Sequence, residues 1–347
     1  MTKAILSFKP KQVTRALLSP LSDRARDIIK KRYGLEEEAE RTTLEAIGKT
    51  YSITRERVRQ IENFALATIR RSEAFTASEP VFSELKDVMD DYGGIVRERD
   101  FLQYLSMDKS YQNHVHFILV LGDYFERIRE DDDFHHRWTV DKDLAEKIHK
   151  SLHSLHKDFS EEDLISETEM LVKFIDHLKK ELKDTKVVRD QTKAKRWLAL
   201  SKVVGKNPLG EWGKASSPNI RARGIRDLAF LVLRNHGSPM HFTEVAKSIE
   251  KKFGRDAHEA TVHNELIKDK RFVLVGRGLY ALSEWGYERG VVRDVIKNVL
   301  SKGGPLTKSE VVDRVLKERH VKENTILVNL QNSRYFRKDK AGRYAPV

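Results

Sequence analysis

The sequence has no cysteine, few prolines and no long apolar run. Among 347 residues there is no cysteine, and there are only 8 prolines. The missing cysteines exclude disulfide bonds and thiolate metal sites, and they fit a reducing compartment. No stretch approaches the roughly 18 uninterrupted apolar residues of a membrane span, and the N-terminus lacks a signal-peptide apolar segment. We therefore expect a cytoplasmic protein without membrane contact.

Common catalytic and metal-binding motifs are also missing. The chain contains no Gly-rich phosphate-binding loop, no nucleophile elbow and no HExxH sequence. Three close histidine pairs occur, but none is combined with a carboxylate at a recognisable metal-ligand spacing. The pairs are His114 with His116, His135 with His136, and His153 with His156. We expect surface or core histidines, no metal, no cofactor and no enzymatic activity.

Positive charge is abundant but uneven. Lys and Arg number 65 against 53 Asp and Glu, which gives a net charge of +12. Residues 81–170 hold 11 basic and 22 acidic side chains, a net of −11, which leaves +23 on the remainder. Because acidic surfaces repel phosphate, we expect nucleic-acid contacts near the two ends. The middle is expected to contact protein or simply to be solvated.

The segment after Leu21 has helix-turn-helix spacing. Ser22 or Asp23 can cap a first helix, and Gly34 can end it. Thr43 can cap a short second helix in which Gly48 allows a tight turn, and Thr54 can cap a third. The apolar stripes predicted to face inward are Ala25, Ile28, Ile29 and Tyr33 in the first helix, and Val58, Ile61, Ala65 and Ile69 in the third.

The third helix carries side chains that can read base edges. Arg pairs with guanine, Gln pairs with adenine, and Glu accepts a hydrogen bond from cytosine. Arg55, Glu56, Arg59 and Gln60 supply all three chemistries on adjacent turns. A mixed-charge helix face is more often a solvated surface with internal ion pairs. The cap and turn that precede this helix favour DNA recognition.

Two stretches, LSDRARDIIKKRYGL and TLEAIGKTYSITRERVRQIENFAL, resemble region 4 of bacterial housekeeping-type sigma factors. The resemblance covers roughly residues 17–71 and does not extend to region 2, so we do not expect a complete initiation factor. It implies reading of a minus-35 promoter element and docking on the flap of the RNA polymerase β subunit. The implied base contacts are Arg55, Glu56, Arg59 and Gln60, and the expected phosphate contacts are Arg24, Arg32, Thr43, Thr54 and Arg57. Phe64 stands where the family commonly has a basic, phosphate-contacting residue.

An internal repeat occupies the C-terminal third. Seven residues from the segment 261–281 recur 64 positions later, which is difficult to obtain by chance. Each copy has three helical patterns followed by two short apolar runs around a glycine turn, and this order predicts a winged helix-turn-helix. The repeated residues are Thr261, Val262, Leu266, Phe272, Gly278, Tyr280 and Ala281.

The first copy, from GIRDLAFLVLRNHGSPMHFTEVAKSI to FVLVGRGLYAL, resembles the HARE-type winged helix. That module occurs in the delta subunit of some bacterial RNA polymerases, in certain restriction enzymes and in chromatin proteins. The resemblance implies DNA binding or polymerase association. Basic residues near both hairpins favour DNA, whereas a protein-interaction module with solvated lysines is the alternative. These residues are Arg271, Arg277, Arg334, Arg337, Lys338 and Arg343.

The sequence as a whole predicts a mostly α, multidomain array of helix-turn-helix and winged helix-turn-helix units with short β-hairpin wings. Trp197 to Val204 is expected to form a terminal strand, and Pro, Gly and Ser punctuation predicts a linker after it. The predicted divisions are a tail (1–14), a region 4-like domain (15–76), an acidic winged-helix-like domain (80–140), a helical or winged-helix-like domain (141–204), a linker (205–222) and two winged helices (223–287 and 288–347).

Two functions follow from this organisation. The first is a promoter-binding transcription regulator or sigma-like factor, associated with bacterial RNA polymerase and the nucleoid, whose partner is double-stranded DNA. The second is an accessory, delta-like polymerase subunit that uses its region 4-like domain mainly for protein contact. Arg59 and Gln60 favour DNA reading, whereas the acidic middle favours the accessory subunit.

Overall fold

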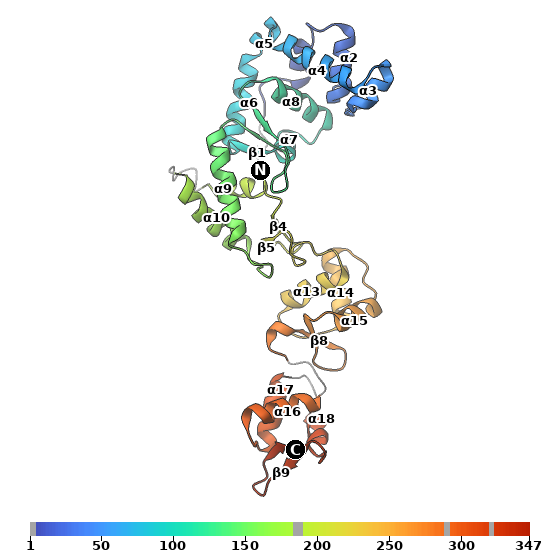
Figure 1. Cartoon of the computed structure of the whole chain (residues 1–347), viewed down its shortest axis with the longest axis vertical. Helices are drawn as coiled ribbons and strands as arrows, with labels where there is room; N and C mark the ends of the chain where they lie inside the picture. The colour runs from blue at the N-terminus through green and yellow to red at the C-terminus, as the bar shows by residue number, and fades with distance from the viewer. Residues whose placement is uncertain (1–4, 183–189, 288–291, 319–322) are drawn as a thin grey trace. The chain divides into compact units, whose positions relative to one another are not determined.

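The computed structural model describes residues 5–182, 190–287, 292–318 and 323–347 (Figure 1). Two compact units divide the chain. One comprises Met1–Gly205 with Trp212–Ala215, and the other comprises Lys206–Glu211 with Ser216–Val347. Helices dominate both units, and the few strands form small antiparallel sheets. The predicted mostly α fold class is confirmed.

A helix-turn-helix domain begins the first unit, and its helices start where the sequence places caps. Ser22 precedes α2, and Gly34 ends it in the left-handed conformation with φ 64°. The Thr43 and Thr54 hydroxyls each accept a backbone N–H at 3.2 Å, from Ala46 and Arg57. The helices are α1 (Pro10–Leu17), α2 (Asp23–Tyr33), α3 (Leu44–Tyr51), α4 (Arg55–Arg70) and α5 (Glu73–Ala77).

The turn before α4 differs in detail from the prediction. Gly48 lies inside α3, and Ser52 is the residue that adopts a positive φ of 55°. A Cβ atom at position 48 would come within 2.7 Å of the Ile53 carbonyl oxygen. The glycine at this position therefore allows the turn to pack closely against α3, whereas Ser52 makes the reversal.

The first winged unit follows directly, and its sheet has the order β1-β3-β2. In this sheet Trp138 pairs with both Val96 and Arg127. Ile69 of α4 and Phe117 of α8 are fully buried members of one apolar cluster, so this unit shares its core with the helix-turn-helix domain. Its elements are α6 (Glu79–Tyr92), β1 (Ile95–Arg97), α7 (Glu98–Leu105), α8 (Lys109–Leu121), β2 (Glu126–Ile128) and β3 (Arg137–Thr139).

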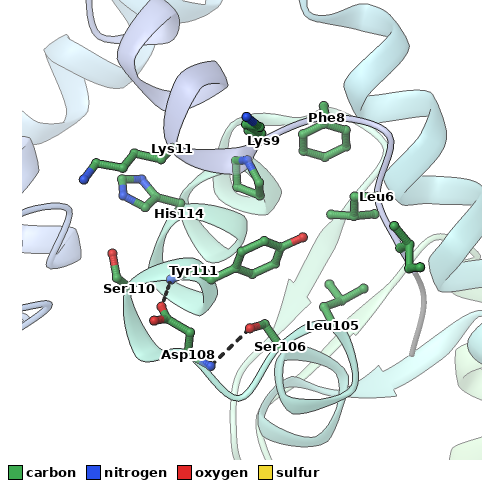
Figure 2. A pocket seen from close by; sticks show the side chains of 12 residues that line it. Leu6, Phe8, Lys9, Lys11, Leu105, Ser106, Asp108, Ser110, Tyr111 and His114 are labelled. Carbon is green, nitrogen blue, oxygen red and sulfur yellow. Dashed lines mark hydrogen bonds between the residues drawn. The ribbon is translucent and has the colours of Figure 1, made fainter. Parts of the chain in front are cut away.

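The N-terminal segment predicted to be a tail is folded where the structure describes it. Leu6 is 8% exposed, Thr14 is 1% exposed, and α1 packs on α8. A cavity of about 660 Å³ lies between this segment and α7–α8. Figure 2 shows Leu6 and Leu105 at one end of the cavity and Lys11 and His114 at the other. The tail prediction is therefore wrong for residues 5–14, because their apolar side chains join the core.

A second winged unit corrects two predictions. Trp197 lies in a helix, not in a terminal strand, and its indole N–H donates to the Gly93 carbonyl at 2.9 Å. The stretch 205–222, predicted to be a linker, contains part of a β-hairpin, whose second strand pairs with Ile165 through Trp212. Turn residues mark a wing as well as a linker. The elements are α9 (Lys142–Lys157), α10 (Glu167–Glu181), α12 (Gln191–Leu198), β4 (Val204–Lys206) and β5 (Trp212–Lys214).

The other compact unit contains the repeated C-terminal segments, here called the third and fourth winged units. In the third, Met240 pairs with Tyr280, and in the fourth Leu306 pairs with Tyr344. The third unit consists of α13 (Ile225–His236), β6 (Met240–His241), α14 (Phe242–Phe253), α15 (Glu259–Lys268), β7 (Phe272–Leu274) and β8 (Leu279–Leu282), followed by the 3-10 turn Ser283–Trp285. The fourth consists of α16 (Val292–Gly303), α17 (Lys308–Glu318), α18 (Glu323–Leu330), β9 (Phe336–Lys338) and β10 (Tyr344–Pro346).

The repeat has a structural explanation for its change of register. Tyr280 and Tyr344 are 64 positions apart, whereas their partners Met240 and Leu306 are 66 positions apart. The fourth copy is therefore two residues shorter than the third between the first strand position and the wing. In the parts of the chain that the structure describes, no helix is both long and apolar enough to cross a membrane.

Candidate nucleic-acid interface

The N-terminal turns of α4 present an exposed polar face. Val58 is completely buried between α2 and α3, which fixes the rotation of α4 about its axis. Because side chains three or four positions apart share a helix face, this rotation leaves another face in solvent. The four candidate base-reading side chains, Arg55, Glu56, Arg59 and Gln60, are all exposed there. The structure thus brings together every residue of the predicted reading set.

Hydrogen bonds within two pairs of side chains organise this face. Arg59 donates two hydrogen bonds to the Glu56 carboxylate, at 2.7 and 2.9 Å, and Arg57 Nη1 donates to Gln60 Oε1 at 3.0 Å. The Arg59 bond holds the pKa of Glu56 below its usual value, and the same bond raises the pKa of Arg59. Exposed pairs of this kind contribute little stability, so the side chains can exchange these bonds for contacts with base edges.

The residues predicted to contact phosphate lie around this face, and the interactions that each makes within the protein differ. Thr43 and Thr54 cap α3 and α4, and their hydroxyl oxygens accept backbone bonds while their protons stay available. The Arg24 guanidinium lies 5.3 Å from the centre of the Tyr51 ring. Arg32 points towards the domain interior, where its Nε lies 3.5 Å from Glu62 Oε1. Thr43, Thr54 and Arg24 have surroundings that suit a backbone contact beside α4, and so does Arg57, which is exposed on α4.

Phe64 extends the outer face of α4 by one further turn. Its side chain is 74% exposed, the largest exposed fraction of any aromatic residue in the described parts of the chain. An exposed phenyl ring offers apolar contact and cannot neutralise a phosphate. The position therefore lacks the charge that the sigma family commonly has, and any contact made there is apolar.

Wing residues of the third and fourth units fall into two groups. Arg277, Arg334, Arg337 and Lys338 are exposed, and Arg343 is exposed but bonds Asp339 at 3.1 Å. Arg271 differs, because its Nη2 lies 2.9 Å from Asp227 and 2.7 Å from Asp269. Both carboxylates hold this half-buried guanidinium against the start of α13. The structure thus separates Arg271 from the exposed wing cations.

The wing of the first unit is acidic but is not uniformly so. Asp131, Asp132 and Asp133 form its turn, and buried Arg137 binds Asp131 at 2.9 Å. Strand β2 contributes Arg127, and Arg129 follows directly after its end, so two cations stand at alternate positions on one side of the extended chain. Sequence reasoning missed them, because it treated residues 81–170 as one acidic segment. Alternation along a short strand was the available signal.

The histidine pairs occupy different surroundings. His114 and His116 are buried on α8, whereas the other four are partly buried. Burial lowers the pKa of both His114 and His116. Among residues 5–182, 190–287, 292–318 and 323–347, no three metal-binding side chains gather at one place.

Comparison with known protein families agrees with two of these domains. Residues 17–71 match the family model of sigma-70 region 4. Residues 224–285 match the family model HARE-HTH, a helix-turn-helix domain described from ASXL and restriction endonuclease proteins among others. Both predicted resemblances are confirmed over these residues.

Curated relatives match only a short part of the chain. The principal sigma factor HrdD of Streptomyces griseus is 42% identical over 69 residues, which is 20% of each chain. The sigma factor SigA1 of Synechococcus elongatus is 50% identical over 54 residues, 16% of this chain and 13% of that protein. The chain therefore spans about a fifth or less of these sigma factors.

Proposed function

We propose that this protein is a sequence-selective DNA-binding factor that acts at promoters in association with RNA polymerase. The exposed face of α4 carries the proposal. Its Arg, Glu and Gln side chains have the chemistry needed to distinguish base pairs in the major groove. The fixed rotation and capped N-terminus of α4 support the proposal, because a recognition helix contacts base edges with exposed side chains of its N-terminal turns.

Within this proposal, Arg55, Glu56, Arg59 and Gln60 read bases, while Arg24, Thr43, Thr54 and Arg57 contact the DNA backbone. The exposed wing cations of the third and fourth units add contacts without sequence preference. Linking several weak sites on one chain raises their effective concentration on the same DNA. Selectivity would then come from α4, and much of the affinity from the wings.

The experiment compares binding to a duplex containing a minus-35-type hexamer with binding to a scrambled duplex. Fluorescence anisotropy at fixed physiological salt gives both dissociation constants. We expect a preference of about a hundredfold or more, within the usual range for specific sites. Arg59→Ala is expected to reduce this preference by about tenfold, in keeping with the discrimination supplied by one bidentate contact.

Arg71→Ala is the matched control. Arg71 is also exposed and lies at the other end of the same helix, about 18 Å from Arg59 at 1.5 Å per residue. Its loss removes the same charge and is expected to leave the preference unchanged. Equal weakening of both duplexes by Arg59→Ala would contradict base reading at this position.

An accessory polymerase subunit is the second candidate function, and the acidic surface of the first winged unit favours it. In that role the helix-turn-helix domain would contact the β flap, and acidic side chains would compete with nucleic acid for basic polymerase surfaces. Equal, weak binding to both duplexes together with tight binding to core polymerase would support this candidate. The inner face of α4 already packs on α2 and α3, and Ala65 and Ile69 belong to the apolar cluster shared with the first winged unit, so a flap helix would have to use another face.

A further inference from the structure

Four arginines converge on a cavity inside the first compact unit, between the helix-turn-helix domain and the sheet of the first winged unit. The cavity measures about 540 Å³, which suits a small ligand. Arg32 comes from α2, Arg41 from the segment before α3, and Arg127 and Arg129 from β2 and its end. Segments distant in sequence therefore assemble one basic pocket.

The acidic groups near this cavity are already engaged. Glu98 accepts bonds from Arg127 at 2.7 and 3.1 Å and from the Trp138 indole N–H at 2.9 Å. Glu62, the carboxylate that lines the cavity, lies 3.5 Å from Arg32 and is hydrogen-bonded to Tyr33. These two carboxylates balance Arg32 and Arg127, which leaves two further cations at the same place.

Arg41 and Arg129 have no carboxylate within salt-bridge distance among the described residues. Arg41 Nε donates to the Asn113 side chain at 2.9 Å, which leaves the other guanidinium N–H groups facing the cavity. Burial lowers the pKa of Arg41; attraction by Glu98 opposes this shift, and repulsion from Arg127 and Arg32 adds to it. Like charges held together in this way favour an anion between them.

A buried histidine forms part of the wall. His116 is 5% exposed, and neither ring nitrogen has a hydrogen-bond partner among the described residues. Its Nε2 lies 3.7 Å from Glu98 Oε2, which is beyond hydrogen-bond distance. Buried polar groups are normally satisfied, so this imidazole is an unsatisfied polar group in the cavity wall.

We propose that this cavity is a binding site for a phosphate group. Arginine guanidinium groups bind phosphate through paired, charge-assisted hydrogen bonds, and two of them here lack an internal anion. The phosphate belongs either to a free oligophosphate, such as a nucleotide, or to the backbone of DNA bound beside α4. The site is independent of base reading by α4, and it goes beyond the proposed function.

The first arm of the test measures binding of inorganic pyrophosphate to the full chain by calorimetry, without DNA. We expect one site, with affinity reduced by at least about tenfold in Arg41→Gln and in Arg129→Gln, because each loses a charge-assisted bond. Lys109→Gln is the matched control, since this exposed lysine lies on α8 and outside the cavity. Circular dichroism melting verifies that each variant is folded.

The second arm measures how DNA affinity depends on salt. If a backbone phosphate occupies the cavity, each arginine variant lowers the slope of log affinity against log salt by about 0.9, whereas Lys109→Gln does not. Pyrophosphate binding that both variants weaken supports a free oligophosphate, and a changed slope alone supports the DNA backbone. Unchanged pyrophosphate binding and an unchanged slope in both variants would overturn the proposal, even if α4 reads DNA as proposed.

Discussion

The first and fourth winged units have the same order of helices and wing strands, yet their wings carry opposite charge. The first wing turns through Asp131, Asp132 and Asp133, whereas the fourth presents Arg337 and Lys338. A wing is an exposed hairpin whose tip side chains do not contribute to the core, so its charge can change without changing the fold. The shared topology therefore does not determine the partner; the residues at each wing do.

The two units also differ in what supports them. The first shares an apolar cluster with the helix-turn-helix domain, and Tyr33 of α2 packs against Phe117 of α8 with ring centres 5.0 Å apart. The fourth has a separate core built from its own helices and Phe336. The unit with the acidic wing is thus joined to the helix-turn-helix domain through a common core, while the basic wing belongs to a unit with a core of its own.

The prediction with the largest expected effect tests whether the cores of the first and fourth units are independent. Phe117→Ala should destabilise the first unit by about 3–5 kcal/mol, since a fully buried phenyl ring leaves a cavity. Because the core is shared, α4 should lose protection in hydrogen exchange together with α8. Phe336→Ala is the control and should weaken the fourth unit while the exchange of α4 is unchanged. Full protection of α4 in Phe117→Ala would show that the two domains fold separately.

Acid should weaken the first unit through the residues that hold its wing. Burial, followed by the charge of Arg137, lowers the pKa of His149 to about 4, and Arg137 Nε donates to His149 Nε2 at 2.8 Å. Between about pH 6.5 and 4, His149 is therefore protonated in the unfolded chain but neutral in the folded chain. The free energy of unfolding consequently falls as the pH falls through this window. Allowing for partial exposure, the loss is about 1–2 kcal/mol.

Urea unfolding at several pH values measures this loss. His149→Gln keeps an acceptor for Arg137 but does not titrate, and it should flatten the acid side of the stability profile. His236→Gln removes an exposed histidine of the third unit and should leave the profile as it is. If the free energy of unfolding depends on pH in the same way in His149→Gln and in the unaltered protein, groups other than His149 cause the loss of stability in acid.

The contrast between the wings can be tested directly with DNA. Replacing Arg337 and Lys338 together with glutamine should lower the salt slope of DNA affinity by about 2, if both contact phosphates. Asp132→Asn in the first wing removes repulsion and should leave affinity unchanged or slightly higher. Anisotropy titrations at four salt concentrations give the slopes, and equal slopes for the double variant and the unaltered protein would exclude the fourth wing from the interface.

Local signals in the sequence predicted much of this structure. Thr43, Thr54 and Gly34 mark helix ends correctly because capping depends on neighbouring backbone groups alone. The 64-residue repeat predicts two equivalent winged units because both copies bury the same positions, such as Leu266 and Leu330. The base-reading set was found because helical spacing determines which side chains share a face.

Long-range contacts account for what the sequence could not predict. The N-terminal segment has few turn signals, and only its packing on α8 shows that Leu6 and Thr14 belong to the core. The second wing was mistaken for a linker, since its pairing with Ile165 joins residues far apart in the chain. Arg41 and Arg129 line one cavity although they are far apart in the sequence, and no local sequence pattern predicts that they do.

The smallest expected effect compares the same turn in the third and fourth units. Gly342 has φ 79° with only the Lys338 side chain nearby, at 3.9 Å from an added Cβ. Gly342→Ala should therefore cost about 1 kcal/mol, from backbone strain alone. Gly278 has φ 68°, but an added Cβ would overlap the His241 ring. Gly278→Ala should consequently cost more in urea unfolding, and equal losses would mean that the His241 ring moves aside freely.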